Sequence, residues 1–351
     1  MLMINKKYTG LNNNIEINYL NNNWEDINIL LQLEKIESLT TINNSYSRLL
    51  LNLNAKDSNI SWVDILGKNK LKSRLSFVSN KINDLKLKFN KEYEDTLFKR
   101  YELTDEIVSC LYENNNYDIP VYDHVSSSTG RSKVSSGKNF LIMKKNNRKN
   151  LKSIYKNGGI YEIDIVSLEP RFFLKYFKNI EVDDVYLHVA ENILNNKNSR
   201  QKIKLGLLAT IYGAGYNTVK KLTGIEKSDY EKIINYFNIN KVNNELSNKF
   251  NIKDKIENAY GRNLYSNTSL LNHFIQSSAA DCAYRAFYNF YFKNKEKFNL
   301  IAVIHDAIII DVPFENISMI EDTYCINEDK LNINLPVTVR RISWDVLKKI
   351  E

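Results

Sequence analysis

The sequence predicts an α+β fold, because runs typical of strands and runs typical of helices occupy different stretches of the chain. Two short runs rich in β-branched and other apolar residues, 160–166 and 301–310, have the composition of buried strands. From Leu71 onward, apolar residues recur in steps of three and four, which is the periodicity of a helix. With 351 residues and 43% hydrophobic content, the chain can bury a substantial core and is expected to form two or three lobes.

The composition indicates a basic protein with an anionic partner. The formal net charge is +8 and the pI is near 9.0, which favours association with nucleic acid. Cys110, Cys282 and Cys325 lack the spacing of a disulfide framework or a zinc site, so we expect a reducing compartment. The chain has neither an apolar run of about 18 residues nor a signal-peptide-like start, so we expect a cytoplasmic protein with no membrane partner.

The region before the first strand is basic and contains one clear helical signal. Residues 1–60 mix weak strand-like and helical patterns, to which we assign no role. The apolar residues from Leu71 to Phe89 fall on one face of a helix of about 25 residues, roughly 38 Å long. Its other faces carry lysine and arginine, so it is either a solvated surface or a surface that follows a phosphate backbone. The stretch 114–159 is rich in turn residues and lysine.

Each strand-like run contains an aspartate, Asp164 in the first and Asp306 in the second. Burying an unpaired carboxylate costs several kcal/mol or raises its pKa until it is neutral. Two such residues therefore suggest a shared partner of high positive charge, and a pair of divalent metal ions is the obvious candidate. The alternative is that each aspartate ends a strand and faces water.

A second helix is predicted between Ser199 and Gly213, which are a plausible N-cap and a plausible C-terminal stop. Arg200, Lys204, Leu208 and Tyr212 recur every four residues and form one stripe on this helix. A stripe of two cations, an apolar residue and an aromatic ring could bind a triphosphate at one end and a base and sugar at the other. The alternative is an ordinary amphipathic helix.

At this point the chain resembles the family A DNA polymerases, the group of bacterial DNA polymerase I. Three motifs occur in the order of that family: Asp164 to Arg171, then Arg200, Lys204, Tyr212 and Gly213, then His305-Asp306. Shorter similarities are Thr129-Gly130-Arg131, Leu187-His188, Tyr260-Gly261-Arg262, Asn272 with Gln276 to Asp281, and Leu335 to Asp345. The resemblance covers about residues 125–351.

The resemblance implies template-directed addition of deoxynucleotides to a primer 3′-hydroxyl. Asp164 and Asp306, with the backbone carbonyl of Ile165, would hold two Mg²⁺ ions, for which Mn²⁺ could substitute. Lys204 would be catalytic, and Glu169 would lie under the sugar and exclude a 2′-hydroxyl. The implied nucleotide-binding residues are Arg200, Lys204, Leu208, Tyr212, Glu169 and His188. The implied DNA-binding residues are Arg131, Arg262, Asn272, Gln276 and His305.

The fold that the resemblance implies is a right-hand polymerase with an antiparallel-sheet palm, helical fingers and a small helical thumb. The expected divisions are an N-terminal region 1–60, a thumb-like helical region 61–117, a palm formed by 118–176 and 261–351, and fingers 177–260. The stretch before the first motif is too short for both a thumb and a proofreading exonuclease domain. We therefore expect no 3′–5′ proofreading.

Three positions depart from the pattern of the family. Leu208 stands where an aromatic residue is usual, Ala307 where glutamate follows the His-Asp pair, and Thr268 where arginine is common. These changes bear on sugar discrimination, base stacking and a supporting carboxylate.

Two other classes of function stay open. One is a single-subunit RNA polymerase or a primase-like nucleotidyltransferase, against which Glu169 argues. The other is an inactive nucleic-acid-binding homologue, against which the intact Asp164 and Asp306 argue. The expected partners are primer–template DNA and dNTPs, and a processivity factor or other replication proteins would be further partners.

Overall fold

The computed structural model describes residues 88–344, apart from 113–114, 128, 196–198 and 266–268. The chain divides into two units, residues 1–102 and 103–351. Residues 1–60, most of the helix expected from Leu71, and Thr268 lie outside the described residues. The predicted thumb-like region 61–117 includes residues of both units.

The described part of the first unit begins a helix that continues into the second. The short helix η1 (Lys91–Tyr93) leads into α7 (Glu94–Asp105). The ring of Phe89 stacks on that of Tyr93, with centroids 4.6 Å apart. Arg100 donates a hydrogen bond to the Tyr93 hydroxyl at 3.2 Å, which ties one turn of α7 to η1.

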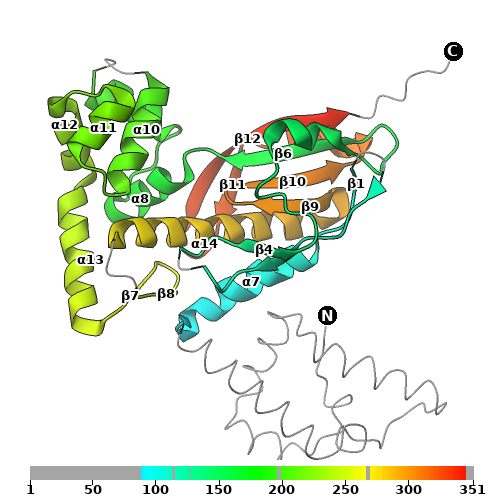
Figure 1. Cartoon of the computed structure of the whole chain (residues 1–351). Helices are drawn as coiled ribbons and strands as arrows, with labels where there is room; N and C mark the ends of the chain where they lie inside the picture. The colour runs from blue at the N-terminus through cyan, green and yellow to red at the C-terminus, as the bar shows by residue number, and fades with distance from the viewer. Residues whose placement is uncertain (1–87, 113–114, 128, 196–198, 266–268, 345–351) are drawn as a thin grey trace, which may run out of the picture. The chain divides into compact units, whose positions relative to one another are not determined.

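The second unit is built on a five-stranded antiparallel sheet, which confirms the predicted α+β class (Figure 1). Both runs predicted to be strands belong to it. The first forms the central strand β6 (Gly159–Ile165), and the second forms the hairpin of β9 (Asn299–Ile304) and β10 (Ala307–Val312). The strand order is β11-β12-β6-β10-β9, with β11 at Cys325–Glu328 and β12 at Ile333–Trp344.

One face of β6 changes from apolar to acidic along the strand. Alternate residues of a strand point to the same face, so Ile160, Glu162 and Asp164 share one face. Ile160 packs in a core cluster with Phe140 and Leu151. The face that is core at the start of the strand therefore carries two carboxylates by its end.

Two helices pack against the sheet and against each other. They are α8 (Leu168–Lys178), which follows β6 directly, and the long helix α14 (Leu270–Lys293), which runs across the sheet in Figure 1. Arg285 of α14 donates from Nε to Glu328 of β11 at 2.9 Å, and both side chains are almost fully buried. This buried ion pair fixes α14 to the edge of the sheet.

The stretch predicted as fingers is helical. It contains α9 (Val185–His188), the π-helical segment η3 (Val189–Ile193), α10 (Arg200–Ile211), α11 (Tyr216–Thr223), α12 (Lys227–Phe237) and α13 (Ile239–Lys253). The predicted ends of α10 are confirmed: the Ser199 side chain accepts from the Lys202 amide, and Gly213 has φ 88°. Gly206 leaves room inside α10 for Ile225, because a Cβ at position 206 would lie 2.6 Å from Ile225 Cδ1 and the Ile225 side chain would have to move.

The remaining elements are short and connect these parts. The small strands are β1 (Leu111–Tyr112), β2 (Asn115–Asn116), β3 (Val121–Asp123), β4 (Lys133–Ser136), β5 (Leu151–Lys152), β7 (Ile256–Glu257) and β8 (Asn263–Leu264). The short helices are η2 (Lys145–Asn150), η4 (Lys295–Lys297), η5 (Phe314–Asn316) and α15 (Ile317–Glu321). Among the described residues, no helix combines the length and the apolar character needed to cross a membrane.

Candidate active site

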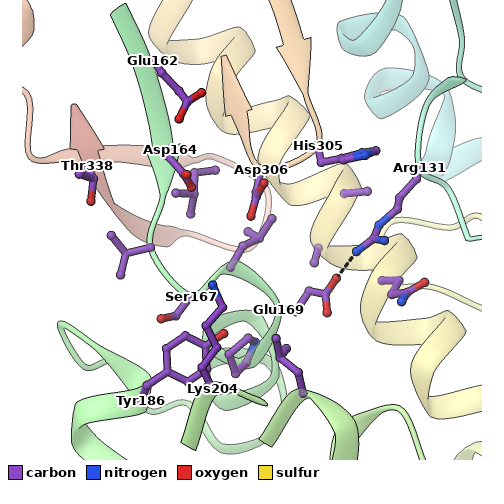
Figure 2. Close-up of a pocket in the computed structure, with 18 of the residues that line it drawn as sticks. Arg131, Glu162, Asp164, Ser167, Glu169, Tyr186, Lys204, His305, Asp306 and Thr338 are labelled. Atoms are coloured by element: carbon purple, nitrogen blue, oxygen red, sulfur yellow. Dashed lines mark hydrogen bonds and ion pairs between the residues drawn. The ribbon is translucent and has the colours of Figure 1, made fainter. Parts of the chain in front are cut away.

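The two aspartates meet at one end of the sheet, although 142 positions separate them in the chain (Figure 2). Asp164 is near the end of β6, and its register partner on β10 is Ala307, the residue after Asp306. The Ile165 amide donates to the Asp306 carbonyl at 2.8 Å, which extends the strand pairing to the turn. The antiparallel register therefore brings both carboxylates to the same place.

The turn that carries Asp306 has an unfavourable backbone. His305 and Asp306 alone connect β9 to β10, and His305 has φ 51°. A side chain in this left-handed region costs roughly 1–2 kcal/mol, and a two-residue turn with positive φ at its first residue alone favours glycine there. Strain of this kind persists mainly where a function needs the residue. The His305-Asp306 pair is thus better explained by its place in the site than by the turn.

The carboxyl group of Asp164 has an environment suited to a cation. Burial, followed by the negative charges of Asp306 and Glu162, raises its pKa to about 6. A divalent cation between Asp164 and Asp306 would relieve this repulsion. No group of three or more His, Cys, Asp or Glu residues suited to a metal occurs in the described part of the chain. Two carboxylates are sufficient for Mg²⁺, which retains water and binds substrate phosphates.

A pocket of about 710 Å³ contains both aspartates. It lies between the end of the sheet, α8, α10 and α14. The predicted site residues that line it are Asp164, Ile165, Asp306, Arg200, Lys204, Leu208, Tyr212, Glu169, Arg131, Gln276 and His305. The fold thus brings together most of the residues proposed from the sequence.

The stripe on α10 faces this pocket, and its two cations differ in their contacts. Arg200 donates from Nε and Nη2 to one oxygen of Asp184, and its guanidinium lies 5.2 Å from the Tyr186 ring. Lys204 is exposed and lies 6.0 Å from the same ring, and within the described residues it forms no ion pair. Of the two cations in the stripe, Lys204 is therefore the one that can bind an anion without first losing an ion pair.

Glu169 connects the wall of the pocket to α10. Its carboxylate accepts from Arg131 Nη2 at 2.8 Å and from the Tyr212 hydroxyl, and it is 12% exposed (Figure 2). Glu169 lies in the first turn of α8, after Ser167 turns the chain with φ 56°. The three side chains form one connected polar group in the pocket that contains the two aspartates.

His188 does not line the pocket. Its Nε2 is hydrogen-bonded to the Tyr236 hydroxyl at 2.8 Å, on α12. The pocket is lined instead by Tyr186 and Asp184, which the sequence analysis did not select. Asp184 accepts from the amides of Tyr186 and Leu187 as the N-cap of α9, and that cap was the local signal for both residues.

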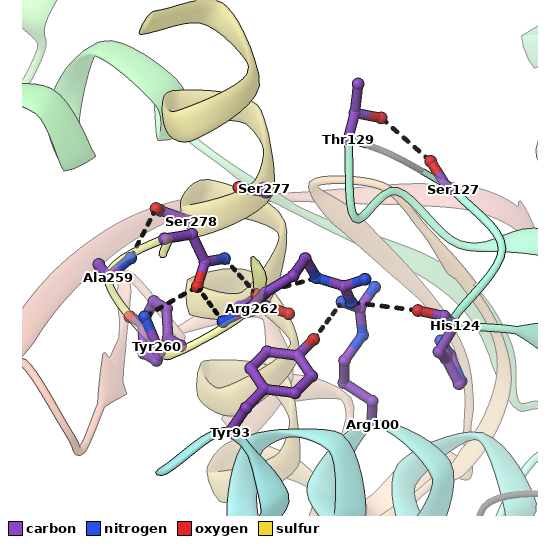
Figure 3. A network of polar contacts seen from close by, with 12 residues as sticks. Tyr93, Arg100, His124, Ser127, Thr129, Ala259, Tyr260, Arg262, Ser277 and Ser278 are labelled. Atoms are coloured by element: carbon purple, nitrogen blue, oxygen red, sulfur yellow. Dashed lines mark hydrogen bonds and ion pairs between the residues drawn. The ribbon is translucent and has the colours of Figure 1, made fainter. Parts of the chain in front are cut away.

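Two residues predicted to bind DNA, Arg262 and Asn272, do not line the pocket that contains the aspartates. Arg262 is 3% exposed; it donates from Nη2 to the His124 carbonyl at 3.1 Å, and its amide donates to Asn258 (Figure 3). These contacts hold Arg262 inside the fold and give it a structural role, and its expected DNA contact stays a prediction. Asn272 lines a second pocket, of about 380 Å³, between the end of α10 and the start of α14.

A cluster of charged residues beside Asp164 was not predicted from the sequence. Glu162 is 2% exposed and is bound by Arg148 and Arg340, with Lys145 at 3.8 Å. The sequence signal for this cluster was Glu162 itself, an acidic residue two positions before Asp164 and therefore on the same face of the strand. Lys145, Glu162 and Arg340 line the pocket.

The structure of this chain is similar to that of a solved polymerase domain. The structure is similar to the polymerase domain of Pol1 from M. smegmatis in complex with DNA primer-template and dNTP, with a TM-score of 0.53 and 14% identity. The match covers 90% of this chain and 66% of that chain, just under two thirds. No curated protein sequence matches this chain. This likeness identifies the fold as that of a polymerase domain.

The sequence model of DNA polymerase family A matches residues 166–343, about half of the chain. The matched region includes α10 and the His305-Asp306 turn, and it begins two residues after Asp164. The chain belongs to DNA polymerase family A.

Proposed function

We propose that the protein is a template-directed DNA polymerase that adds deoxynucleotides to a primer 3′-hydroxyl. The observation that carries this proposal is the single pocket in which Asp164 and Asp306 face the α10 stripe of Arg200 and Lys204. Membership of DNA polymerase family A supports it, as does the likeness to a domain that binds primer-template and dNTP.

Asp164 and Asp306, with the carbonyl of Ile165, would hold the divalent metal ions, Mg²⁺ or Mn²⁺. Bound there, the ions would supply charge that favours ionisation of the 3′-hydroxyl and stabilises the leaving pyrophosphate. Within the described residues no third carboxylate joins them, and Ala307, opposite Asp164 in the sheet, cannot provide one. The two aspartates would therefore be the carboxylates that bind the metal ions.

The cations of α10 would bind the triphosphate. Most of the catalysis in phosphoryl transfer is positioning and electrostatic stabilisation. Lys204 is exposed in the pocket, so it can bind phosphate directly. Arg200 would first have to share or release Asp184. Leu208 and Tyr212, further along the same face, would border the sugar and base.

Other residues of the pocket would bind the primer–template and check the sugar. Arg131, Gln276 and His305 line it and are candidates for minor-groove or primer contacts. Glu169, held between Arg131 and Tyr212, would exclude a 2′-hydroxyl. This arrangement favours deoxynucleotides over ribonucleotides.

Primer extension with Mg²⁺ on a primed DNA template tests the proposal. We expect extension by the unaltered protein and loss of at least 100-fold in Asp164→Ala and Asp306→Ala, the range for removal of a major electrostatic contributor. Asp322→Ala, which removes an exposed carboxylate outside the pocket, is the matched control. Undiminished extension by either active-site variant contradicts the metal assignment.

The same assay separates the competing functions. Preferential use of NTPs would identify an RNA polymerase or primase-like enzyme instead. DNA binding without extension, under any divalent metal, would identify an inactive homologue. A primer with a mismatched 3′ end tests the further proposal that proofreading is absent, because a proofreading enzyme would shorten that primer before extending it.

A further inference from the structure

A second pair of cations lines the pocket on the side of Asp164 away from α10. Lys145 comes from η2 and Arg340 from β12, and both bind the same oxygen of Glu162, Oε1, at 3.8 and 2.7 Å. Figure 2 shows Glu162 on the far side of Asp164 from Lys204 and Tyr186. The pocket thus has positive charge at two ends and the two aspartates between them.

The strand register accounts for this position. Arg340 is the partner of Glu162 across β12 and β6, and Thr338 is the partner of Asp164. Residues 338 and 340 share a face of β12, so Arg340 lies two residues along β12 from the register partner of Asp164. Thr338 and Arg340 both line the pocket.

These two cations exceed the negative charge of Glu162. One cation balances the charge of a carboxylate, and Arg148, whose side chain is 8% exposed, already binds the other oxygen of Glu162. The side chains of Lys145 and Arg340 are 62% and 47% exposed, and in the described part of the chain no other acid pairs with them. Glu162 therefore holds two half-exposed cations close together with an excess of positive charge.

The geometry of the reaction indicates which phosphate this site would bind. In phosphoryl transfer the attacking and leaving oxygens lie roughly in line, on opposite sides of the transferred phosphorus. If Arg200 and Lys204 hold the triphosphate on one side of the aspartates, the primer approaches from the other side. Lys145 and Arg340 both bind Glu162, which lies on that other side of Asp164.

We propose that Lys145 and Arg340, held together by Glu162, bind a backbone phosphate of the primer strand near its 3′ end. The proposal rests on the polymerase function proposed above. Their role is to position the primer, since neither contacts the reacting atoms. The ligand chemistry is a phosphodiester, and the nucleotide triphosphate is the competing source of phosphate.

The test compares two double variants. Lys145→Ala with Arg340→Gln removes the proposed site. Lys149→Ala with Arg341→Gln removes the same charges from the same two elements but outside the pocket, since Arg341 pairs with Glu321 instead. Thermal melting checks that both variants are folded. Binding of fluorescent primer–template is measured by anisotropy without dNTP or divalent metal, across a series of salt concentrations.

The pocket variant should bind primer–template on the order of tenfold more weakly. Its slope of log affinity against log salt should become shallower by about 1, because a complex with one phosphate contact fewer releases fewer counterions when it forms. The control variant should change both quantities much less. With saturating DNA, the KM for dNTP should be unchanged in the pocket variant. A raised KM for dNTP with unchanged DNA affinity would assign the site to the nucleotide and overturn the proposal.

Neutral methylphosphonate linkages locate the contact. A single methylphosphonate linkage near the primer 3′ end should weaken DNA binding by the unaltered protein. The same linkage should weaken DNA binding by the pocket variant little further. The same linkage in the template strand should weaken binding of both equally. Equal effects from both strands would overturn the proposal. The binding assay needs no catalysis. If the linkage in the primer weakens binding only when Lys145 and Arg340 are present, but the protein does not extend primers, the polymerase function is refuted and the phosphate site is not.

Discussion

Asp184 binds Arg200 through two nitrogens of the guanidinium, Nε at 2.8 Å and Nη2 at 2.7 Å. Asp184 is also the N-cap of α9, where it accepts from the amides of Tyr186 and Leu187. Asp184, the residue that starts α9, therefore forms an ion pair with Arg200, one of the two cations proposed to bind the triphosphate. Asp184 and an incoming nucleotide would compete for Arg200.

Asp184→Asn should lower the KM for dNTP. Asparagine caps a helix as well as aspartate does, so α9 should be retained while the charge that holds Arg200 is lost. A partly exposed ion pair is worth about 1 kcal/mol, so we expect KM to fall about fivefold. Steady-state single-nucleotide incorporation measures this. The control is Asp183→Asn, an exposed neighbour outside the pocket; an unchanged or higher KM for Asp184→Asn would show that Asp184 positions Arg200 instead.

Asp164→Asn should stabilise the protein at neutral pH in the absence of metal. The folded-state pKa of Asp164, about 6, is above its ordinary value of 3.8, so its stabilising contribution is complete below 3.8 and is lost as pH rises through 6. Asparagine avoids that loss. We expect a higher Tm for the variant at pH 7.5 in EDTA, and a difference that shrinks as pH falls toward 4.5. Asp322→Asn serves as the control and should show no such pH dependence.

Glu169→Gln should weaken discrimination against ribonucleotides and lower the efficiency of dNTP incorporation. The change removes the charge that holds Arg131, and it weakens the acceptor of the Tyr212 hydroxyl. Single-turnover incorporation of dNTP and the matching NTP measures the ratio. Tyr212→Phe, which removes one of the two contacts and keeps the ring, should give a smaller change in the same direction. A ratio that stays constant in Glu169→Gln would remove Glu169 from sugar selection.

Glu328→Ala should destabilise the fold by about 3 kcal/mol, because it leaves Arg285 buried without its main carboxylate partner. Asp329, at 2.9 Å from Arg285, should limit the loss. Urea denaturation measures the free energy of unfolding. The exposed pair of Glu321 and Arg341 provides the comparison, since Glu321→Ala should cost less than about 1 kcal/mol. Equal losses would show that the buried pair does not secure α14 to β11.

Features that depend on neighbouring residues were predictable from the sequence. Ser199 and Gly213 bound α10 as expected, because capping and left-handed stops involve only a few consecutive residues. The β-branched runs around Asp164 and Asp306 form strands of one sheet. The family motifs also indicated which residues share the site, because each family motif marks residues that lie close together in the fold although they are distant in the chain.

Contacts between distant segments were settled by packing. Glu162 meets Arg148 and Arg340, which are 14 and 178 positions away, and no local pattern links these three residues. Tyr186 reaches the pocket while His188 turns to Tyr236, because the direction of each side chain depends on how α9 packs against α10 and α12. Arg262 is buried for the same reason. Local backbone preferences identified the strands, the helix and the aspartates, and long-range packing selected which other side chains line the site.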